Sequence, residues 1–129
     1  TICTPVCMDG TKEKQFEEGS FDRILLDVPC SGMGDLSHKP EIRYHLQPEN
    51  LDELIEIQKK LLDTNCCYIK KNGILVYSTC TLNKKENETQ IQQFLKRHEE
   101  FELLSQKTFF PFEENGDGFY VAQLIRKVL

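Results

Sequence analysis

Residues 21–34, FDRILLDVPCSGMG, contain the pattern from which the arrangement of the whole chain follows. The apolar run at their start lacks the alternation of a half-exposed strand, which predicts a central parallel strand covered on both faces. The proline and two glycines that follow end this strand in a turn, and the glycines let a ligand approach the backbone closely. The strand therefore delivers Asp27 and Cys30 to its carboxyl end.

A second apolar run, residues 74–77, leads directly into Ser78, Thr79 and Cys80. Cys80 follows Cys30 by fifty residues (80 minus 30), and each thiol lies just past a predicted strand. In an open α/β sheet, reactive groups gather beyond the carboxyl ends of the strands. We therefore expect both thiols at one cleft, which is the geometry that a cysteine enzyme needs.

Between these strands, apolar residues at positions 51–69 follow helical spacing and predict a helix. Asn50 with Glu53 forms a capping-box-like start, and Asn72-Gly73 is a common helix exit. A strand, a helix and a strand in this order predict a right-handed parallel crossover.

The flanking segments continue the alternation of strands and helices. Residues 3–8 predict an earlier strand, and Asn83 with Glu86 predicts the start of another helix. Residues 101–112 predict a strand with an aromatic loop, and residues 119–125 predict the last strand. The chain is therefore expected to have an α/β fold, and nothing in it marks a boundary between domains.

The composition is that of an ordinary globular protein. Of 129 residues, 39% are hydrophobic and 29% are charged, and no segment approaches the roughly 18 apolar residues of a membrane span. The first residues lack the features of a secretory signal. We expect a cytoplasmic protein with no membrane partner, whose six cysteines are reduced thiols.

The charge balance opposes a simple electrostatic attraction to nucleic acid. Sixteen basic and 21 acidic residues give a net charge of -5, so affinity for a polyanion needs a local feature. Lys39 and Arg43 belong to a small basic cluster after the first motif. Such a cluster can hold a phosphate beside a reactive thiol, or it can be a solvated loop with ordinary charges.

Cys80 and Asp27 each admit a functional and a structural interpretation. A free cysteine has a pKa near 8.5 and is roughly 3% thiolate at neutral pH. The positive end of a helix that starts near Lys84 would favour the Cys80 thiolate, but a cysteine can also pack as a small apolar residue. Asp27 follows an apolar strand, where burial without a partner is costly, so it either binds a ligand or caps a nearby loop.

Five short elements together resemble the Fmu/Sun family (RsmB-like) of RNA 5-methylcytosine methyltransferases, and the resemblance spans nearly the whole chain. The elements follow the family's order and spacing: residues 27–34 (DVPCSGMG), 39–43 (KPEIR), 75–81 (LVYSTCT), 86–88 (ENE) and 116–119 (GDGF). Val28 stands where the family commonly has alanine, and both residues are small and apolar.

The resemblance implies a partial Rossmann-like, S-adenosylmethionine-dependent methyltransferase fold. Residues 1–129 are then a single domain that forms the carboxyl-terminal part of a catalytic domain, without the family's glycine-rich donor-binding loop. In the family's sheet, two further strands lie between the strand ending at Asp9 and the strand ending at Asp27. Without them, the Asp27 strand has an unpaired edge that invites self-association, and the isolated chain is expected to be inactive.

The resemblance also implies a mechanism. Cys80 adds to carbon 6 of cytosine, which makes carbon 5 nucleophilic enough to take the methyl group of S-adenosyl-L-methionine. Cys30 then assists removal of the carbon 5 proton or release of the enzyme. Asp27 bonds to the cytosine and lies close to the donor, and Asp9 contacts the donor's adenine unless it only caps its loop.

The implied partner is RNA, with ribosomal RNA ahead of transfer RNA as the substrate. The base must leave its stack to be reached, which favours single-stranded or distorted RNA. Pro29, Lys39 and Arg43 are the candidate substrate-binding residues, and no metal ligand is expected. A non-catalytic α/β binding module with structural or metal-binding cysteines is the main alternative, although Cys66-Cys67 and distant single cysteines fit zinc poorly. A thiol oxidoreductase is a third, but the chain has no Cys-x-x-Cys.

Overall fold

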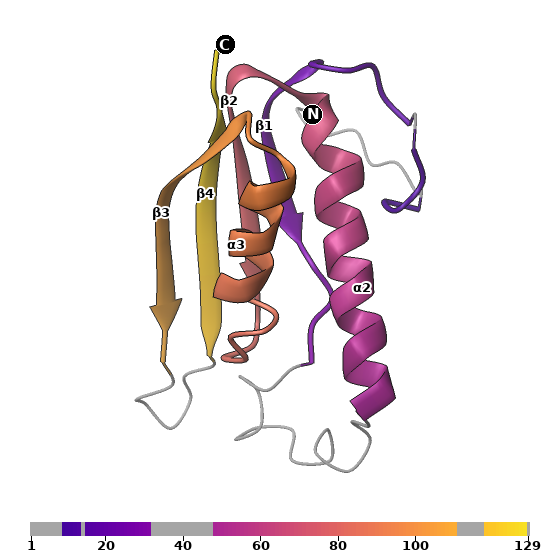
Figure 1. Ribbon diagram of the computed structural model, residues 1–129, viewed down its shortest axis with the longest axis vertical. Helices are drawn as coiled ribbons and strands as arrows, with labels where there is room; N and C mark the ends of the chain where they lie inside the picture. Colours follow the sequence, from indigo (N-terminus) through magenta and orange to yellow (C-terminus); the bar gives the residue numbers. More distant parts are fainter. Residues whose placement is uncertain (1–8, 14, 32–47, 111–117, 129) are drawn as a thin grey trace, which may run out of the picture.

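The computed structural model describes residues 9–13, 15–31, 48–110 and 118–128. Within these residues, four strands form one sheet and two α-helices lie against it (Figure 1). In chain order the elements are β1 (Phe21–Asp27), α2 (Pro48–Asn65), the short 3-10 helix η1 (Cys66–Tyr68), β2 (Ile69–Thr79), α3 (Glu88–Arg97), β3 (Phe101–Phe109) and β4 (Phe119–Arg126). The predicted α/β class is confirmed.

The strand order in the sheet is β1-β2-β4-β3. β1 and β2 are parallel, whereas β4 is antiparallel to both of its neighbours, β2 and β3. β3 therefore runs in the same direction as β1 and β2. These three strands have their carboxyl ends at one edge of the sheet, at the bottom of Figure 1, which we call the carboxyl edge; the other end is the opposite edge.

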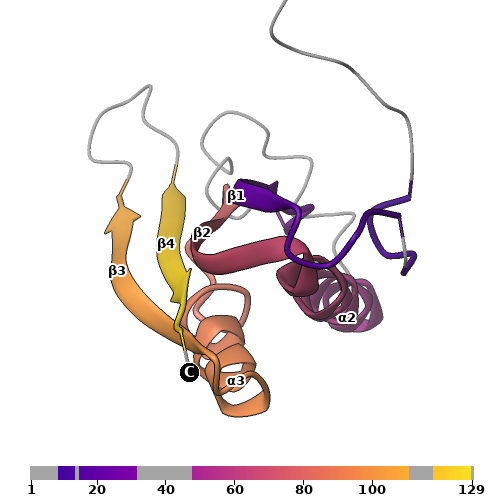
Figure 2. The same cartoon turned by 90° about the horizontal axis from the view of Figure 1, so that it is seen from above.

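Both α-helices cover the same face of the sheet (Figure 2). α2 connects β1 to β2, and α3 connects β2 to β3. The core between sheet and helices is made of apolar side chains from strands and helices alike, including Leu62, Leu75, Tyr77, Ile91, Phe94, Ala122 and Leu124. Since each large apolar side chain contributes roughly 1.5–3 kcal/mol on full burial, this layer holds the helices and strands together.

α2 ends earlier than the sequence pattern predicts. It begins at Pro48, two residues before the predicted start, and ends at Asn65, so the predicted exit at Asn72-Gly73 is wrong. Those two residues lie inside β2, where pairing with β1 is irregular. Asn72 has a φ of 67°, and a Cβ atom on Gly73 would lie 2.8 Å from the Lys70 carbonyl oxygen. The two residues therefore form an irregularity in a strand, which demands the same backbone freedom as a helix exit.

α3 begins later than predicted. Its first residue is Glu88, and a turn precedes it. Asn83 Oδ1 accepts the backbone N–H of Lys85 at 3.1 Å, while Glu86 is fully buried. The predicted helix start at Asn83, and with it the helix end beside Lys84, is therefore wrong, because these residues close a turn before the helix begins.

The remaining strand predictions agree with the structure where it describes the chain. β3 lies within the predicted residues 101–112, and β4 matches the predicted last strand to within one residue. β2 contains the predicted run 74–77 and extends it in both directions. The strand predicted at residues 3–8 lies outside the described residues.

β1 is less covered than its apolar sequence predicts. Within the described sheet it pairs with β2 alone, and the Leu25 side chain is 66% exposed. The expectation of a strand covered on both faces is therefore wrong for the described part of this chain, because the described helices cover only one face. None of the helices in the described ranges combines the length and the apolar character that crossing a membrane demands.

Candidate active site

The carboxyl ends of β1 and β2 lie side by side and bring the two predicted thiols together. Asp27 pairs with Ser78 in the parallel register, and the Val28 N–H donates to the Ser78 carbonyl oxygen at 3.1 Å. Just beyond, the backbone N–H of Cys80 donates to the Sγ atom of Cys30 at 3.2 Å. Both cysteines are half-buried. One site at the carboxyl edge therefore contains both sulfur atoms.

Asp27 lies at the same edge, and its carboxylate is exposed. The Ser78 hydroxyl donates to its Oδ1 atom at 2.9 Å. Because β1 has no further strand beside it in the described sheet, the carboxylate does not bear the cost of burial without a partner, and its role as a ligand-binding group stays a prediction. An ionised carboxylate accepts about four hydrogen bonds, so Asp27 keeps capacity to bind donor groups of a ligand.

The carboxylate of Glu86 connects the two strand ends from inside the protein. Its Oε1 atom accepts the Ser31 N–H at 2.8 Å and the Gln58 side-chain amide at 3.0 Å. Its Oε2 atom accepts the Ser31 hydroxyl at 2.7 Å and the Asn83 side-chain amide at 2.9 Å. Glu86, Ser31 and Gln58 are buried. None of the three was predicted to belong to the site, although one signal for Gln58 exists in the sequence: it is a polar residue at an apolar position of the helical pattern.

Cys80 lies between two threonines whose polar groups are fixed. The Thr79 hydroxyl donates to Asn87 Oδ1 at 2.6 Å, and the Asn87 side-chain amide donates to the Thr81 carbonyl oxygen at 2.9 Å. Thr79, Thr81 and Asn87 are buried, whereas Cys80 is half-buried. The loop therefore presents the Cys80 thiol from a backbone that is held on both sides.

Asp9 is engaged in its own loop. Its Oδ1 atom accepts the Thr11 hydroxyl at 2.6 Å and the Thr11 N–H at 2.9 Å, and these hydrogen bonds hold the pKa of the exposed Asp9 carboxyl below its usual value. The same loop contacts the carboxyl end of α2, where the Asn65 amide donates to the Gly10 carbonyl oxygen at 3.0 Å. The structure thus shows the loop-capping interpretation of Asp9, and its contact with a donor stays a prediction.

The predicted substrate-binding residues are only partly described. Pro29 is exposed, and its carbonyl oxygen accepts the Gln58 side-chain amide at 2.9 Å. Lys39 and Arg43 lie outside the described residues.

A cavity of about 550 Å³ among the described residues lies away from the two cysteines. It lies along the outer side of α2, between that helix and the loop that carries Phe16, and Ile57 and Tyr68 line it. Its position away from the carboxyl edge gives it no part in the arrangement of Cys30, Cys80 and Asp27.

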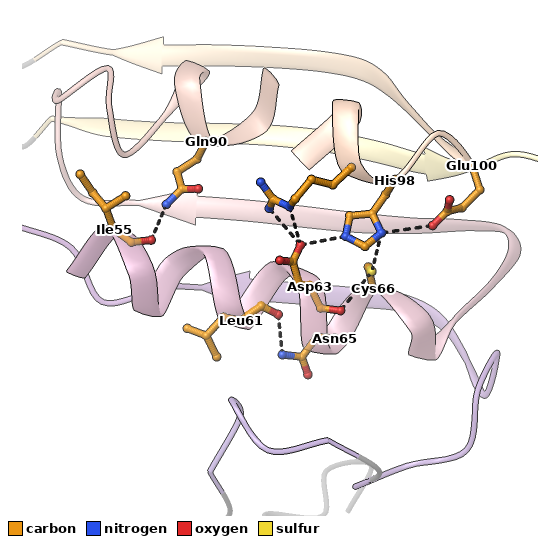
Figure 3. A network of polar contacts seen from close by, with 9 residues as sticks. Ile55, Leu61, Asp63, Asn65, Cys66, Gln90, His98 and Glu100 are labelled. Atoms are coloured by element: carbon orange, nitrogen blue, oxygen red, sulfur yellow. Dashed lines mark hydrogen bonds and ion pairs between the residues drawn. The ribbon is translucent and has the colours of Figure 1, made fainter. Parts of the chain in front are cut away.

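At the opposite edge, another cysteine, Cys66, lies beside His98 (Figure 3). Cys66 Sγ lies 3.7 Å from His98 Nδ1, and His98 Nε2 lies 2.8 Å from Asp63 Oδ1. Arg97 also donates to Asp63, and Glu100 lies 3.4 Å from the His98 ring. Cys66 is 3% exposed, and this burial raises the pKa of its thiol to about 12. In the described part of the chain, no three side chains of the metal-ligating kind gather as a metal ion requires.

The comparisons with known protein sequences agree on one family. The sequence profile described as "16S rRNA methyltransferase RsmB/F" matches residues 1–125. Ribosomal RNA small subunit methyltransferase B of Yersinia enterocolitica is 37% identical over 127 residues, which cover 92% of this chain and 30% of that protein. The probable ribosomal RNA small subunit methyltransferase B of Synechocystis is 41% identical, over 80% of this chain and 27% of that protein. The chain thus spans about 30% of the length of these curated relatives.

Solved structures agree with this fold. The crystal structure of PH0851 is 30% identical with a TM-score of 0.90, over 97% of this chain and 31% of that chain. The structure of NSun6 from Pyrococcus horikoshii with SFG has a TM-score of 0.80 at 24% identity, over 96% of this chain and 34% of that chain. At this identity the similarity indicates a shared fold only. The predicted Rossmann-like fold of S-adenosylmethionine-dependent methyltransferases is confirmed.

Proposed function

Because the chain belongs to the RsmB/F family of 16S rRNA methyltransferases, we propose that it supplies the catalytic cysteines of an RNA cytosine-5 methyltransferase. The observation that carries this proposal is the hydrogen bond from the Cys80 N–H to Cys30 Sγ, 3.2 Å long, at the carboxyl edge beside Asp27. Two thiols at one site suit a reaction in which one cysteine bonds to the base and the other helps to end that bond.

In the proposed mechanism, the Cys80 thiolate forms a bond to carbon 6 of the cytosine. The electron pair of the carbon 5–carbon 6 double bond shifts to carbon 5 and, by conjugation, toward the ring nitrogen. Asp27 in its acid form donates its proton to that nitrogen, while its other oxygen accepts the N–H of the exocyclic amine, so the developing charge is neutralised. Carbon 5 then takes the methyl group, the carbon–sulfur bond of the donor breaks with its electron pair left on sulfur, and the ring nitrogen returns its proton to Asp27. Cys30 accepts the carbon 5 proton, the double bond forms again, and the bond between Cys80 Sγ and carbon 6 breaks.

S-adenosylmethionine supplies the methyl group when it is bound. Among the residues of this chain, Asp27 would lie close to the donor, and Asp9 would contact its adenine.

We propose that residues 1–129 are the carboxyl-terminal part of a catalytic domain whose other residues complete the donor site. The share of the relatives that the chain spans and the exposed outer face of β1 at Leu25 support this. Calorimetry on the 129-residue chain should show very weak donor binding or none, and micromolar affinity would contradict it.

The proposed substrate is ribosomal RNA rather than transfer RNA, in the cytoplasm, with Pro29, Lys39 and Arg43 near the backbone of the extruded nucleotide. The names of the relatives support the ribosomal choice. Bisulfite sequencing of RNA from cells lacking the gene should reveal one lost 5-methylcytosine in small-subunit ribosomal RNA, and a loss in transfer RNA alone would contradict it.

We also propose that the isolated chain self-associates through the unpaired edge of β1. Its sedimentation coefficient should then rise with protein concentration, and a constant value would contradict this.

The nucleophile is tested with matched cysteine variants of the longer protein that contains this sequence. Cys80→Ala should abolish RNA methylation, whereas Cys66→Ala, at the opposite edge, should retain it. Activity in Cys80→Ala would reject the assignment. Cys30→Ala should instead accumulate a covalent RNA adduct, seen as a shifted band on a denaturing gel, because the step that follows methyl transfer is slowed.

A further inference from the structure

We propose that Glu86 is a positioning residue that holds the turn carrying Cys30 against the loop carrying Cys80. This inference rests on the proposed function for its catalytic consequence, but the structural part of it can be measured without activity. Glu86 is fully buried and sits between the two cysteine-bearing segments. It contacts the residue that follows Cys30 directly, and it reaches the residue that follows Cys80 through that contact.

The hydrogen bonds of Glu86 match the capacity of an ionised carboxylate. Its two oxygens accept four donors: the N–H and the hydroxyl of Ser31, the Gln58 amide and the Asn83 amide. An ionised carboxylate offers about four acceptor sites and donates nothing, so the set is complete. Since Ser31 supplies two of the four donors, the carboxylate fixes both the backbone and the side chain of the residue next to Cys30.

A chain of hydroxyl groups extends this attachment to the residue next to Cys80. The Ser31 and Thr81 hydroxyl oxygens lie 3.0 Å apart, and Thr81 Oγ1 accepts the Asn83 N–H at 3.2 Å. Because the Ser31 hydroxyl donates its hydrogen to Glu86, it accepts the hydrogen of Thr81. Every hydrogen in this chain therefore points toward Glu86, whose two acceptor oxygens set the direction.

The helices and β2 hold Glu86 in turn. Gln58 on α2 donates to both Glu86 and the Pro29 carbonyl oxygen, and its own oxygen lies 3.3 Å from the Gln90 side-chain amide on α3. The Tyr77 hydroxyl donates to the Glu86 carbonyl oxygen at 2.6 Å. Glu86 is thus held at its carboxylate by α2, at its backbone by β2, and through Gln58 by α3. These contacts fix the position from which the carboxylate binds Ser31 in the turn of Cys30.

The substitution Glu86→Gln tests the role because it keeps the size of the side chain and changes one acceptor into a donor. With its oxygen toward the Ser31 N–H and Gln58, the new amide stands in place of Oε2 and faces two groups that donated to it, the Ser31 hydroxyl and the Asn83 amide. The Ser31 hydroxyl can turn to accept a hydrogen, but this reverses its hydrogen bond with Thr81 and loosens the attachment of the Cys30 turn. Asn83 cannot simply rotate by half a turn, because its Oδ1 atom already accepts the Lys85 N–H at 3.1 Å. Asn83→Asp in the same chain restores an acceptor there, so the double variant should recover what the single variant loses.

The first measurement is amide hydrogen exchange on the 129-residue chain. Glu86→Gln should lower the protection of the Ser31 and Cys80 amides relative to core amides, and Glu86→Gln with Asn83→Asp should restore it. Glu56→Gln, an exposed position on α2, is the matched control and should change neither amide. Unchanged protection in Glu86→Gln, or an equal loss across all core amides, would overturn the proposal.

The second measurement uses the longer protein and its RNA. A displacement of about 1 Å at a reacting group can slow turnover on the order of a hundredfold, so Glu86→Gln should lower turnover to about that extent. Because Cys30 acts after methyl transfer, the covalent RNA adduct should accumulate while RNA binding is unchanged. A fall in turnover without adduct would overturn the role toward Cys30. A wild-type protein that methylates no RNA would reject the proposed function, while the exchange result would still decide the role of Glu86.

Discussion

The two edges of the sheet use cysteine in opposite ways. At the opposite edge, the Cys66 thiol donates to the Asp63 carbonyl oxygen at 3.4 Å beside His98, and it is almost completely buried. At the carboxyl edge, Cys30 Sγ accepts a backbone N–H, and both Cys30 and Cys80 are half-buried. A donated N–H stabilises a sulfur anion, whereas burial opposes one. The direction of the hydrogen bond and access to water therefore separate a reactive cysteine site from a packed one.

The histidine at the opposite edge illustrates this distinction (Figure 3). Cys66, His98 and Asp63 follow one another within hydrogen-bonding range, which is the order of a cysteine protease triad. However, Cys66 is buried in the core, and this burial raises the pKa of its thiol to about 12. His98 and Asp63 join α2 to the end of α3. Residues of the types found in a catalytic triad do not form an active site when a substrate cannot reach the thiol.

The largest expected difference between the two edges is in thiol alkylation. At about pH 8, a thiol with a pKa of about 12 is roughly one part in ten thousand thiolate, against about one part in four for an ordinary thiol. Iodoacetamide should therefore modify Cys80 at least about a thousandfold faster than Cys66 in a Cys67→Ser background, measured by mass spectrometry of the peptides. In urea, the two rates should become similar. Comparable rates in the folded chain would contradict the conclusion that Cys66 is a packed thiol and Cys80 an accessible one.

The second expected difference is in alkaline stability. Because the pKa of Cys66 is raised from 9.0 to about 12 on folding, its contribution is complete below about pH 9 and is lost as the pH rises toward 12. Between about pH 8 and about pH 10.5 this loss amounts to about 2 kcal/mol. Burial also raises the pKa values of Tyr77 and Tyr120, so all variants should weaken at high pH.

Urea unfolding at both pH values measures the effect of Cys66 alone. In Cys66→Ala, the free energy of unfolding should fall by about 2 kcal/mol less over this range than in the unsubstituted chain, whatever the substitution costs at about pH 8. The same pH dependence in both proteins would show that the Cys66 thiol ionises without unfolding.

For elements with a clear apolar pattern, the sequence predicts their position in the chain better than it predicts their first and last residues. β2, β3 and β4 lie where the apolar runs predict them, since a buried strand leaves a direct pattern. The end of α2 was misplaced because Asn72-Gly73 satisfies an irregular strand and a helix exit equally well. An Asn-Gly pair indicates that unusual backbone angles are allowed at that point, but it does not indicate whether a helix end or an irregular strand uses them.

At the site, the meeting of Cys30 and Cys80 could be predicted from two strand ends alone, because parallel strands share their carboxyl edge. The network around Glu86 could not. Its partners come from α2, from the turn after β1 and from the loop after β2, and only the packed fold brings them together. The exposure of Asp27 follows from the unpaired edge of β1 in the described sheet, which the family resemblance implies but the apolar pattern of the strand does not.

A smaller effect is expected from the tyrosine beneath the carboxyl edge. Tyr77→Phe removes the hydroxyl that donates to the buried Glu86 carbonyl oxygen at 2.6 Å, and it should lower the free energy of unfolding by about 1–2 kcal/mol in urea. Tyr120→Phe is the matched control. Its hydroxyl donates to Gln106, whose exposed side chain can bind water instead, so it should cost less. Equal losses of unfolding free energy in the two variants would show that the effect comes from the burial of the tyrosine hydroxyl and not from its hydrogen bond to Glu86.

The smallest effect is expected at the opposite edge, where Asp63 joins Arg97 and His98. Asp63 is 33% exposed, so Asp63→Asn should lower the free energy of unfolding by only about 0.5 kcal/mol, and added salt should shrink that loss. Asp22→Asn, whose partner Lys70 is more exposed, should change nothing measurable. A loss well above about 1 kcal/mol that persists in salt would mean that Asp63 acts through its hydrogen bonds as a buried anchor. The two edges would then both depend on a carboxylate, and access to the thiol would remain the property that distinguishes them.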